Sequence, residues 1–346
     1  MRLICVEEHA IDEAIMAAAK STMEQQAPYA RVQSAASAAA PDPDAPAQHV
    51  VEMGEAVRAG GDLGAGRLRD MDEHGIDLQV VSYSSPIQLT PADQAVALAT
   101  AANDRLGAAV AANPDRLQGF AALPWQAPLA AVDELDRAVT ELGLRGVLIV
   151  GRPGVTFLDD PRYEPVLAKL AELGVPLYLH PFHPIRQVQQ AYYAGLPDAV
   201  SAEFSLGAWG WHHEAGVHLL RLILSGAFER FPALQVISGH WGEMVPFYLS
   251  RLDQVLSRHV TGLSATVSET FRAHVWVTPA GIVDEPHFRF VRDVVGVDRI
   301  IWSTDYPYVT MNGNRSFLED ADLTETERHQ VMHGNAEALF RLPPAI

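Results

Sequence analysis

Histidine and carboxylate side chains stand at the ends of several apolar runs in this sequence, and their types suit metal chemistry. Glu7 and His9 close the run ICVEEH, His180 closes VPLYLH, and Asp305 follows RIIWST. Neutral imidazoles and carboxylates bind Zn²⁺, Mn²⁺ or Fe²⁺ in sites that lack thiolates. We expect these residues to supply two oxygens and two nitrogens to one divalent ion. Their two carboxylates would offset its charge and leave a nearly neutral centre that accepts an anionic substrate.

A further apolar run, LQVISG, is followed by His240 and, three residues later, by Glu243. We expect His240 to stay off the metal and to act as an acid–base group that Glu243 orients. A lone histidine at such a position is more often an ordinary core or surface residue. Four apolar runs that end in this way are hard to assign to chance.

The N-terminal run also predicts how its acids are directed. Side chains alternate between the two faces of a strand, so Glu7 and His9 should project to one face and Glu8 to the other. Glu7 and His9 would then form a short chelate. Glu8 is expected to support the site or the fold, or to be an acid that faces solvent.

The elements that must position these residues alternate between β-rich and helical patterns. The β-rich runs are Leu3–Val6, Leu78–Tyr83, Leu117–Leu123, Gly146–Val150, Pro176–Leu179, Leu234–Ser238, His274–Thr278 and Arg299–Ser303. The helical patterns cover Pro91–Asn113, Ala130–Leu142, Tyr163–Leu173, Glu214–Phe231 and Glu243–Leu256. Eight strands that each precede a helical segment predict a (β/α)₈ TIM barrel of the α/β class; a doubly wound open sheet is the alternative. Barrel enzymes carry their functional groups at the carboxyl ends of the strands.

Composition limits the class of protein. The chain has 346 residues, 48% of them apolar, and we expect one domain over 1–346 with an Ala-, Pro- and Gly-rich, flexible insertion at about 21–66 over the barrel mouth. A formal charge of −18 argues against nucleic acid or an anionic membrane as the partner. The single cysteine, Cys5, excludes an internal disulfide and is expected in the core. No apolar run reaches membrane-spanning length, and we expect a soluble cytoplasmic protein.

An aromatic segment, GAWGWHHEAGVH over 207–218, lies ahead of one predicted helix. We expect Trp209 and Trp211 to line a pocket or a subunit interface. The three histidines of this segment are expected to be ordinary polar or packing residues rather than a second metal site: His212, His213 and His218. Further candidates for the pocket wall, each nearly as well explained as a core aromatic, are Tyr83, Tyr306 and Tyr308.

The ordered set of motifs resembles the metal-dependent decarboxylase branch of the amidohydrolase superfamily. This branch includes decarboxylases of γ-resorcylate, 2,3-dihydroxybenzoate, 5-carboxyvanillate and aminocarboxymuconate semialdehyde. The resemblance rests on the Glu-x-His pair, LHP, GHWGE and STDYP, and it extends over RLRDMDEHGID (67–77), 102–124, 216–243 and GNAEALFRL (334–342). It implies a (β/α)₈ barrel that assembles as a homodimer or homotetramer and acts on a small carboxylic acid.

The resemblance also implies roles for individual residues. Glu7, His9, His180 and Asp305 correspond to the ligands of one Zn²⁺ or Mn²⁺ ion, and His240 and Glu243 to the acid–base pair. Asp305 is the implied proton donor to a phenolic acid that binds the metal through its carboxylate and an ortho hydroxyl. Arg251 corresponds to an arginine that contacts substrate or reaches a neighbouring subunit.

Two departures from the family pattern affect the predicted pocket. Close aromatic decarboxylases show HPRNP where this chain has HPFHP, so Phe182 and His183 stand in place of an arginine and an asparagine. TPAG (278–281) lacks a hydroxyl at Ala280. A metal-dependent decarboxylase of an aromatic hydroxy acid or a muconate-like acid is therefore the leading prediction. The alternatives are a hydrolase or hydratase that acts on a lactone or conjugated acid through a metal-bound water, and a barrel without catalytic activity.

Overall fold

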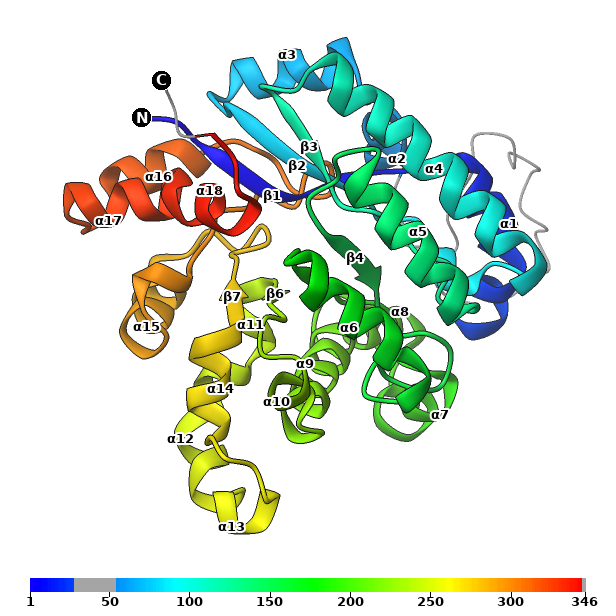
Figure 1. Cartoon of the computed structure of the whole chain (residues 1–346), viewed down its shortest axis with the longest axis vertical. Helices are drawn as coiled ribbons and strands as arrows, with labels where there is room; N and C mark the ends of the chain where they lie inside the picture. The colour runs from blue at the N-terminus through cyan, green and yellow to red at the C-terminus, as the bar shows by residue number, and fades with distance from the viewer. Residues whose placement is uncertain (28–53, 344–346) are drawn as a thin grey trace.

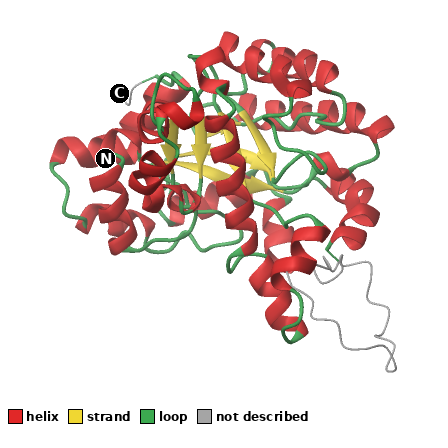
Figure 2. Ribbon diagram, turned by 90° about the horizontal axis from the view of Figure 1, so that it is seen from below, coloured by secondary structure: helices red, strands yellow, loops and turns green. Residues whose placement is uncertain are grey.

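Parallel strands form the centre of the molecule and helices surround them (Figures 1 and 2). The computed structural model describes residues 1–27 and 54–343. Each neighbouring pair of strands within a sheet is parallel, as the alternating sequence pattern predicts. The strands are β1 (Ile4–Ala10), β2 (Leu78–Tyr83), β3 (Leu117–Gly119), β4 (Val147–Val150), β5 (Leu177–His180), β6 (Val236–Ser238) and β7 (Val275–Val277).

Backbone hydrogen bonds join the two regular sheets, β1-β2-β3 and β4-β5-β6-β7, to each other. Ala121, just beyond β3, donates to the Gly146 carbonyl at 2.8 Å and accepts from the amide of Leu148 in β4 at 3.2 Å. The predicted strand over 117–123 is therefore regular only over its first three residues. Its remainder still pairs with β4.

The segment 299–303, predicted as the eighth strand, closes the ring. Ile301 donates to the Val277 carbonyl of β7 at 3.1 Å, and Trp302 accepts from the Val6 amide of β1 at 2.8 Å. The segment pairs through these isolated contacts rather than as a regular strand. Because it bonds to both β7 and β1, the sheet has no open edge there, as a (β/α)₈ barrel requires and a doubly wound sheet does not.

The predicted helices are present, and their observed bounds differ by a few residues at each end. One differs more: the pattern over 214–231 is divided at Gly226, whose left-handed φ of 74° ends one helix and begins the next. The helices that follow the strands are α3 (Ala65–Glu73), α4 (Ala92–Ala112), α5 (Pro128–Thr140), α6 (Glu164–Leu173), α9 (Gly210–Leu224), α10 (Ala227–Arg230), α12 (Val245–Val255), α14 (Val267–His274) and α15 (Glu285–Val294). Shorter or terminal helices are α1 (Glu13–Gln26), α2 (Gly54–Gly60), α7 (Arg186–Val188), α8 (Asp198–Ser205), α11 (His240–Glu243), α13 (Arg258–Thr261), α16 (Asn314–Asp320), α17 (Glu325–His329) and α18 (Asn335–Phe340).

The predicted insertion over 21–66 is only partly described. Its first residues belong to α1 and its last residues to α2 and the start of α3, while 28–53 lie outside the described residues. Its flexibility and its place over the barrel mouth stay predictions. Among the helices of the described ranges, none is long and apolar enough to cross a membrane.

Apolar side chains fill two layers, one inside the barrel and one between strands and helices. Ile4 and Val6 of β1 pack inward with Leu78 and Ile237, while Cys5 packs outward against the helices. Phe340 of α18 joins the inner cluster. Alternating strand residues thus fill both layers, and the polar residues gather where the strands end.

A fully buried arginine ties the outer helices to the end of β1. Arg67 of α3 is 0% exposed. It donates from Nη2 to the His9 carbonyl at 2.5 Å, from Nη1 to Gln79 Oε1 at 3.0 Å and from Nε to the Asp62 carbonyl at 2.9 Å. Its guanidinium also lies 5.0 Å from the ring centroid of Tyr306. Arg67 thereby fixes the backbone beside the candidate site.

Replacing Arg67 with methionine should destabilise the protein strongly. The variant keeps the volume but leaves the buried His9 carbonyl and Gln79 oxygen without donors, so we expect a loss of about 3–5 kcal/mol in the free energy of unfolding. Chemical unfolding followed by circular dichroism measures this change. Arg289→Met, at an exposed ion pair with Glu285, is the matched control and should stay within about 0.5 kcal/mol of the parent. Equal stability of the two variants would contradict the structural role of Arg67.

Candidate metal centre

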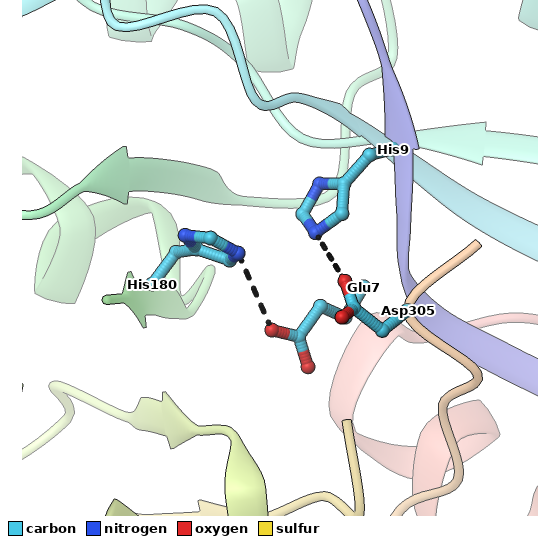
Figure 3. A group of neighbouring side chains, drawn as sticks. All are labelled: Glu7, His9, His180 and Asp305. Atoms are coloured by element: carbon cyan, nitrogen blue, oxygen red, sulfur yellow. Dashed lines mark ion pairs between the residues drawn. The ribbon is translucent and has the colours of Figure 1, made fainter. Parts of the chain in front are cut away.

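Four side chains from distant parts of the sequence converge at the carboxyl end of the barrel (Figure 3). Glu7 and His9 come from β1, His180 from the last residue of β5, and Asp305 from the loop after 299–303. One potential ligand atom of each lies within 4.8 Å of the others. His9 Nε2 is 3.2 Å from Asp305 Oδ1, and His180 Nε2 is 3.7 Å from Glu7 Oε1. The structure therefore brings together the residues that the sequence predicted as ligands.

The backbone of β1 reaches this arrangement through an irregularity. The pairing with β2 shifts register between Val6 and Glu8, and Glu7 has a left-handed φ of 73°. A bulge of this kind redirects a side chain next to a site. The regular alternation expected from the sequence is thus interrupted at Glu7. Glu8 is nevertheless separate from the cluster, because its carboxylate accepts from Gln79 Nε2 at 3.1 Å and from the Thr304 amide at 2.8 Å.

Neighbouring side chains hold Glu7 by one oxygen only. Tyr178 donates to Glu7 Oε2, and Thr278 Oγ1 lies 3.2 Å from the same oxygen. Gly239 leaves room for the carboxylate, since a Cβ there would lie 3.1 Å from both carboxylate oxygens. Glu7 Oε1 is therefore presented to His180 and the rest of the cluster.

Three buried atoms of this cluster make no hydrogen bond among the described residues: Glu7 Oε1, His9 Nε2 and Asp305 Oδ1. The last two lie 3.2 Å apart but are not aligned for a hydrogen bond. Buried polar atoms are almost always paired, so such a group of orphans indicates a missing partner. His180 Nδ1 lies 2.7 Å from the Pro181 carbonyl, which fixes a proton on Nδ1 and leaves Nε2 with a lone pair. Anionic oxygens and imidazole lone pairs that face one another fit a divalent cation.

The electrostatics of the cluster agree with this fit. Burial raises the pKa of Asp305 to about 7, and burial together with the nearby Asp305 raises the pKa of Glu7 well above its ordinary value. Burial lowers the pKa of His9 to about 3 and that of His180 well below its ordinary value. The imidazoles are thus neutral, as ligands must be. The carboxylates lack the positive charge that would stabilise their ionised form.

A second group of titratable side chains adjoins this cluster. His240 Nδ1 lies 2.8 Å from Glu243 Oε1, which is the orienting contact that the sequence predicted. His212 Nδ1 lies 2.9 Å from the other oxygen, Glu243 Oε2, and its ring centroid is 4.3 Å from that of His240. Burial opposes ionisation of Glu243, but its contacts with the two histidines hold its pKa below the ordinary value.

His212 is a site residue that sequence reasoning missed. It was predicted to be an ordinary polar or packing residue, and no motif or spacing relates it to Glu243. His218 of the same segment has the packing role expected of it, because it is buried and accepts from the Leu158 amide at 3.1 Å. Trp209 is 45% exposed, whereas Trp211 lines the cavity beside the cluster.

A cavity of about 270 Å³ opens onto both groups. His180, His240 and Asp305 form its polar side, and Phe182, His183 and Trp211 form another part of its wall. Met16 and Met23 of α1 and Val57 of α2 also line it. The described ends of the predicted insertion therefore contribute to the pocket.

The predicted substrate-binding residues divide into two sets. Phe182, His183 and Tyr308 line the cavity. Tyr83 lies in the core, where its hydroxyl donates to the Ala102 carbonyl at 3.1 Å. The remaining two are also away from the cavity: Tyr306 donates to Asp70 Oδ2 at 2.8 Å, and Arg251 is exposed on α12. Tyr83 and Tyr306 pack toward the outer helices instead of the barrel mouth, and Arg251 lies on the surface of a helix.

Comparisons with known proteins agree with the fold. A family model described as amidohydrolase matches residues 48–342. A γ-resorcylate decarboxylase of Rhodococcus jostii is 36% identical over 292 residues, which cover 80% of this chain and 87% of that protein. The decarboxylase orsB of Emericella nidulans is 33% identical over 81% of this chain and 86% of its own length.

A solved structure extends the comparison to three dimensions. It is a dihydroxybenzoic acid decarboxylase from a Polaromonas species with bound manganese and the inhibitor 2-nitroresorcinol. Its TM-score is 0.83 at 30% identity, and the match covers 99% of this chain and 98% of that one. The chain therefore belongs to the amidohydrolase family.

Proposed function

We propose that this protein is a metal-dependent, non-oxidative decarboxylase of an aromatic hydroxy acid or a muconate-like acid. The observation that carries the proposal is the group of orphaned ligand atoms on Glu7, His9 and Asp305, which adjoins, through Asp305 and His180, a cavity sized for a small acid. The related proteins named above are decarboxylases, which supports the reaction type. The family match begins at residue 48, so the roles of Glu7 and His9 rest on geometry.

Glu7, His9, His180 and Asp305 would hold one divalent ion. The manganese in the Polaromonas enzyme supports Mn²⁺, and the same ligand set also suits Zn²⁺. When bound, the ion supplies Lewis-acid polarisation and a charge that orients the carboxylate of the substrate. Within the described residues no lysine or arginine lines the cavity, so this chain offers no cationic side chain there for the same task.

The side chains of the site can move the protons that decarboxylation requires. A proton from Asp305 adds to the ring carbon that bears the carboxylate. The bond from that carbon to the carboxylate then breaks, its electron pair returns to the ring, and CO₂ leaves. His240, oriented by Glu243, would hold or exchange a proton with the phenolic oxygen. Solvent finally restores the proton to Asp305.

We also propose that the protein is a cytoplasmic homodimer or homotetramer. Phe247, Tyr248 and Phe290 form an exposed aromatic patch, with the rings of Phe247 and Phe290 5.9 Å apart. Arg251 lies one helical turn from Phe247 on α12. This position favours the interpretation in which Arg251 faces a neighbouring subunit. Light scattering of the purified protein measures the assembly, and a monomer would contradict it. The cytoplasmic location rests on composition alone.

A CO₂-release assay tests the proposed reaction. The Mn²⁺-loaded protein is incubated with 2,6-dihydroxybenzoate and with 2,3-dihydroxybenzoate, and released CO₂ and the phenolic product are measured. Asp305→Asn should lower turnover by at least about 100-fold because it removes both a ligand charge and the proton donor. Asp320→Asn, an exposed aspartate of α16, is the control and should retain full activity. Water added to a conjugated acid or a lactone, without CO₂, would instead favour a hydratase or hydrolase.

Removing one ligand should remove the metal. His180→Ala takes away an imidazole and leaves two buried carboxylates and one imidazole, so we expect metal affinity to fall at least about 100-fold. Metal content by mass spectrometry after dialysis should be about one ion per chain in the parent and near zero in the variant. His259→Ala, on the exposed helix α13, should bind metal like the parent. Full metal content in His180→Ala would contradict the assignment.

A further inference from the structure

We propose that His212 is a positioning residue for His240 and acts through Glu243. The inference rests on the proposed function, in which His240 serves as the acid–base group. Glu243 has a fully buried side chain, and its two oxygens contact different histidines: Oε1 lies 2.8 Å from His240 Nδ1 and Oε2 lies 2.9 Å from His212 Nδ1. The carboxylate thus bridges two imidazoles rather than one.

The bridge determines which nitrogen of His240 is free. An ionised carboxylate only accepts hydrogen bonds, so His240 carries its proton on Nδ1 and donates it to Glu243 Oε1. Nε2 is then the nitrogen that His240, a residue of the cavity wall, can offer to a substrate. Rotation of Glu243 would remove the acceptor that selects this tautomer, and it would free the ring of His240 to reorient.

His212 donates to Glu243 in either of its protonation states. Its second nitrogen, Nε2, lies 2.8 Å from the Gly207 carbonyl and 3.0 Å from the indole nitrogen of Trp211. A neutral His212 accepts from Trp211 at Nε2 and keeps its proton on Nδ1. A charged His212 donates to Gly207 from Nε2 and still donates to Glu243 from Nδ1. The contact with Glu243 is therefore independent of the charge on His212.

The backbone brings α9 close enough for this contact. Gly216 lies one helical turn after His212 on the same face of α9. A Cβ at Gly216 would lie 2.6 Å from the Glu243 carbonyl oxygen, so only glycine permits this approach. Residues 240–244 all have left-handed φ values between 47° and 84°, which is costly for the non-glycine residues. Such strain persists where surrounding contacts hold the backbone, as the Glu243 bridge does here.

Loss of His212 would leave Glu243 Oε2 buried without a donor. The carboxylate could then rotate, so His240 would lose the fixed acceptor at Nδ1 and with it both its single tautomer and its single ring position. No metal ligand and no side chain of the cavity wall is removed by this change, although the indole nitrogen of Trp211 loses its contact with His212. We therefore expect a defect in turnover rather than in substrate affinity.

Two substitutions of His212 and one control test the inference. His212→Phe removes the donor and retains a ring, and His212→Asn retains an N–H that can reach Oε2. His213→Asn is the matched control, because His213 is the next residue of α9 and makes no contact with Glu243 in the described structure. All variants are loaded with Zn²⁺ or Mn²⁺ and compared for kcat, KM, metal content and unfolding midpoint.

We expect His212→Phe to lower kcat by about 10- to 100-fold with KM within about threefold of the parent, as substitutions behind a site residue typically do. His212→Asn should restore much of the loss, and His213→Asn should match the parent. Each variant should keep one metal ion per chain. Equal kcat in His212→Phe and the parent would overturn the inference, as would a fall in unfolding midpoint that His212→Asn does not rescue.

A second readout does not require turnover. Nitrogen-15 NMR of histidine-labelled, Zn²⁺-loaded protein reports the tautomer of His240, which should be the Nδ1–H form in the parent and mixed in His212→Phe. If no acid releases CO₂ from the parent, the proposed reaction fails while this spectrum still tests the bridge. An unchanged spectrum in His212→Phe would overturn the inference. The parent could instead bind a second metal ion that His212→Phe does not bind. That result would replace the positioning role with a second metal site on His212, His240 and Glu243.

Discussion

Burial of two carboxylates beside two neutral imidazoles is the constraint on which the rest of this structure depends. Glu7 and Asp305 meet His9 and His180 at the carboxyl end of the barrel, and burial raises the pKa values of both acids. An ionised carboxylate without a compensating charge is costly in such a place. The orphaned atoms of the cluster point to a cation as the missing partner. The fold must therefore fix the orientation of each candidate ligand side chain, which would otherwise turn toward solvent or another hydrogen-bond donor.

The support comes from parts of the chain that are far apart in sequence. Tyr178 and Thr278 occupy one oxygen of Glu7, and Gly239 leaves space for the other to reach the cluster. Arg67 holds the carbonyl of His9 from the outer layer of helices. Because the barrel closes through contacts of 299–303 with both neighbouring strands, the loop that carries Asp305 is fixed relative to β1. The site is therefore a property of the closed barrel rather than of any one motif.

The cavity wall contains both residues that the sequence predicts to depart from the family pattern after the fifth strand. Phe182 and His183 both line it. Methionines of α1 and Val57 of α2 add apolar surface. The predicted departures thus lie on the cavity wall and not among the four candidate ligands. Such a distribution is expected when one metal chemistry serves acids of different shape.

Local patterns in the sequence were sufficient to predict the parallel strands, most helices and the four candidate ligands. Apolar periodicity and helix-stopping residues act over a few positions, and parallel strands of a barrel necessarily bring their carboxyl ends to one rim. The bulge at Glu7, the packing of Tyr83 against α4 and the bridge from His212 to Glu243 could not be read in this way. Each depends on contacts between segments distant in sequence, and the bridge requires Gly216 to admit α9 against α11. Packing between elements, rather than the pattern within them, decided which histidines share the site.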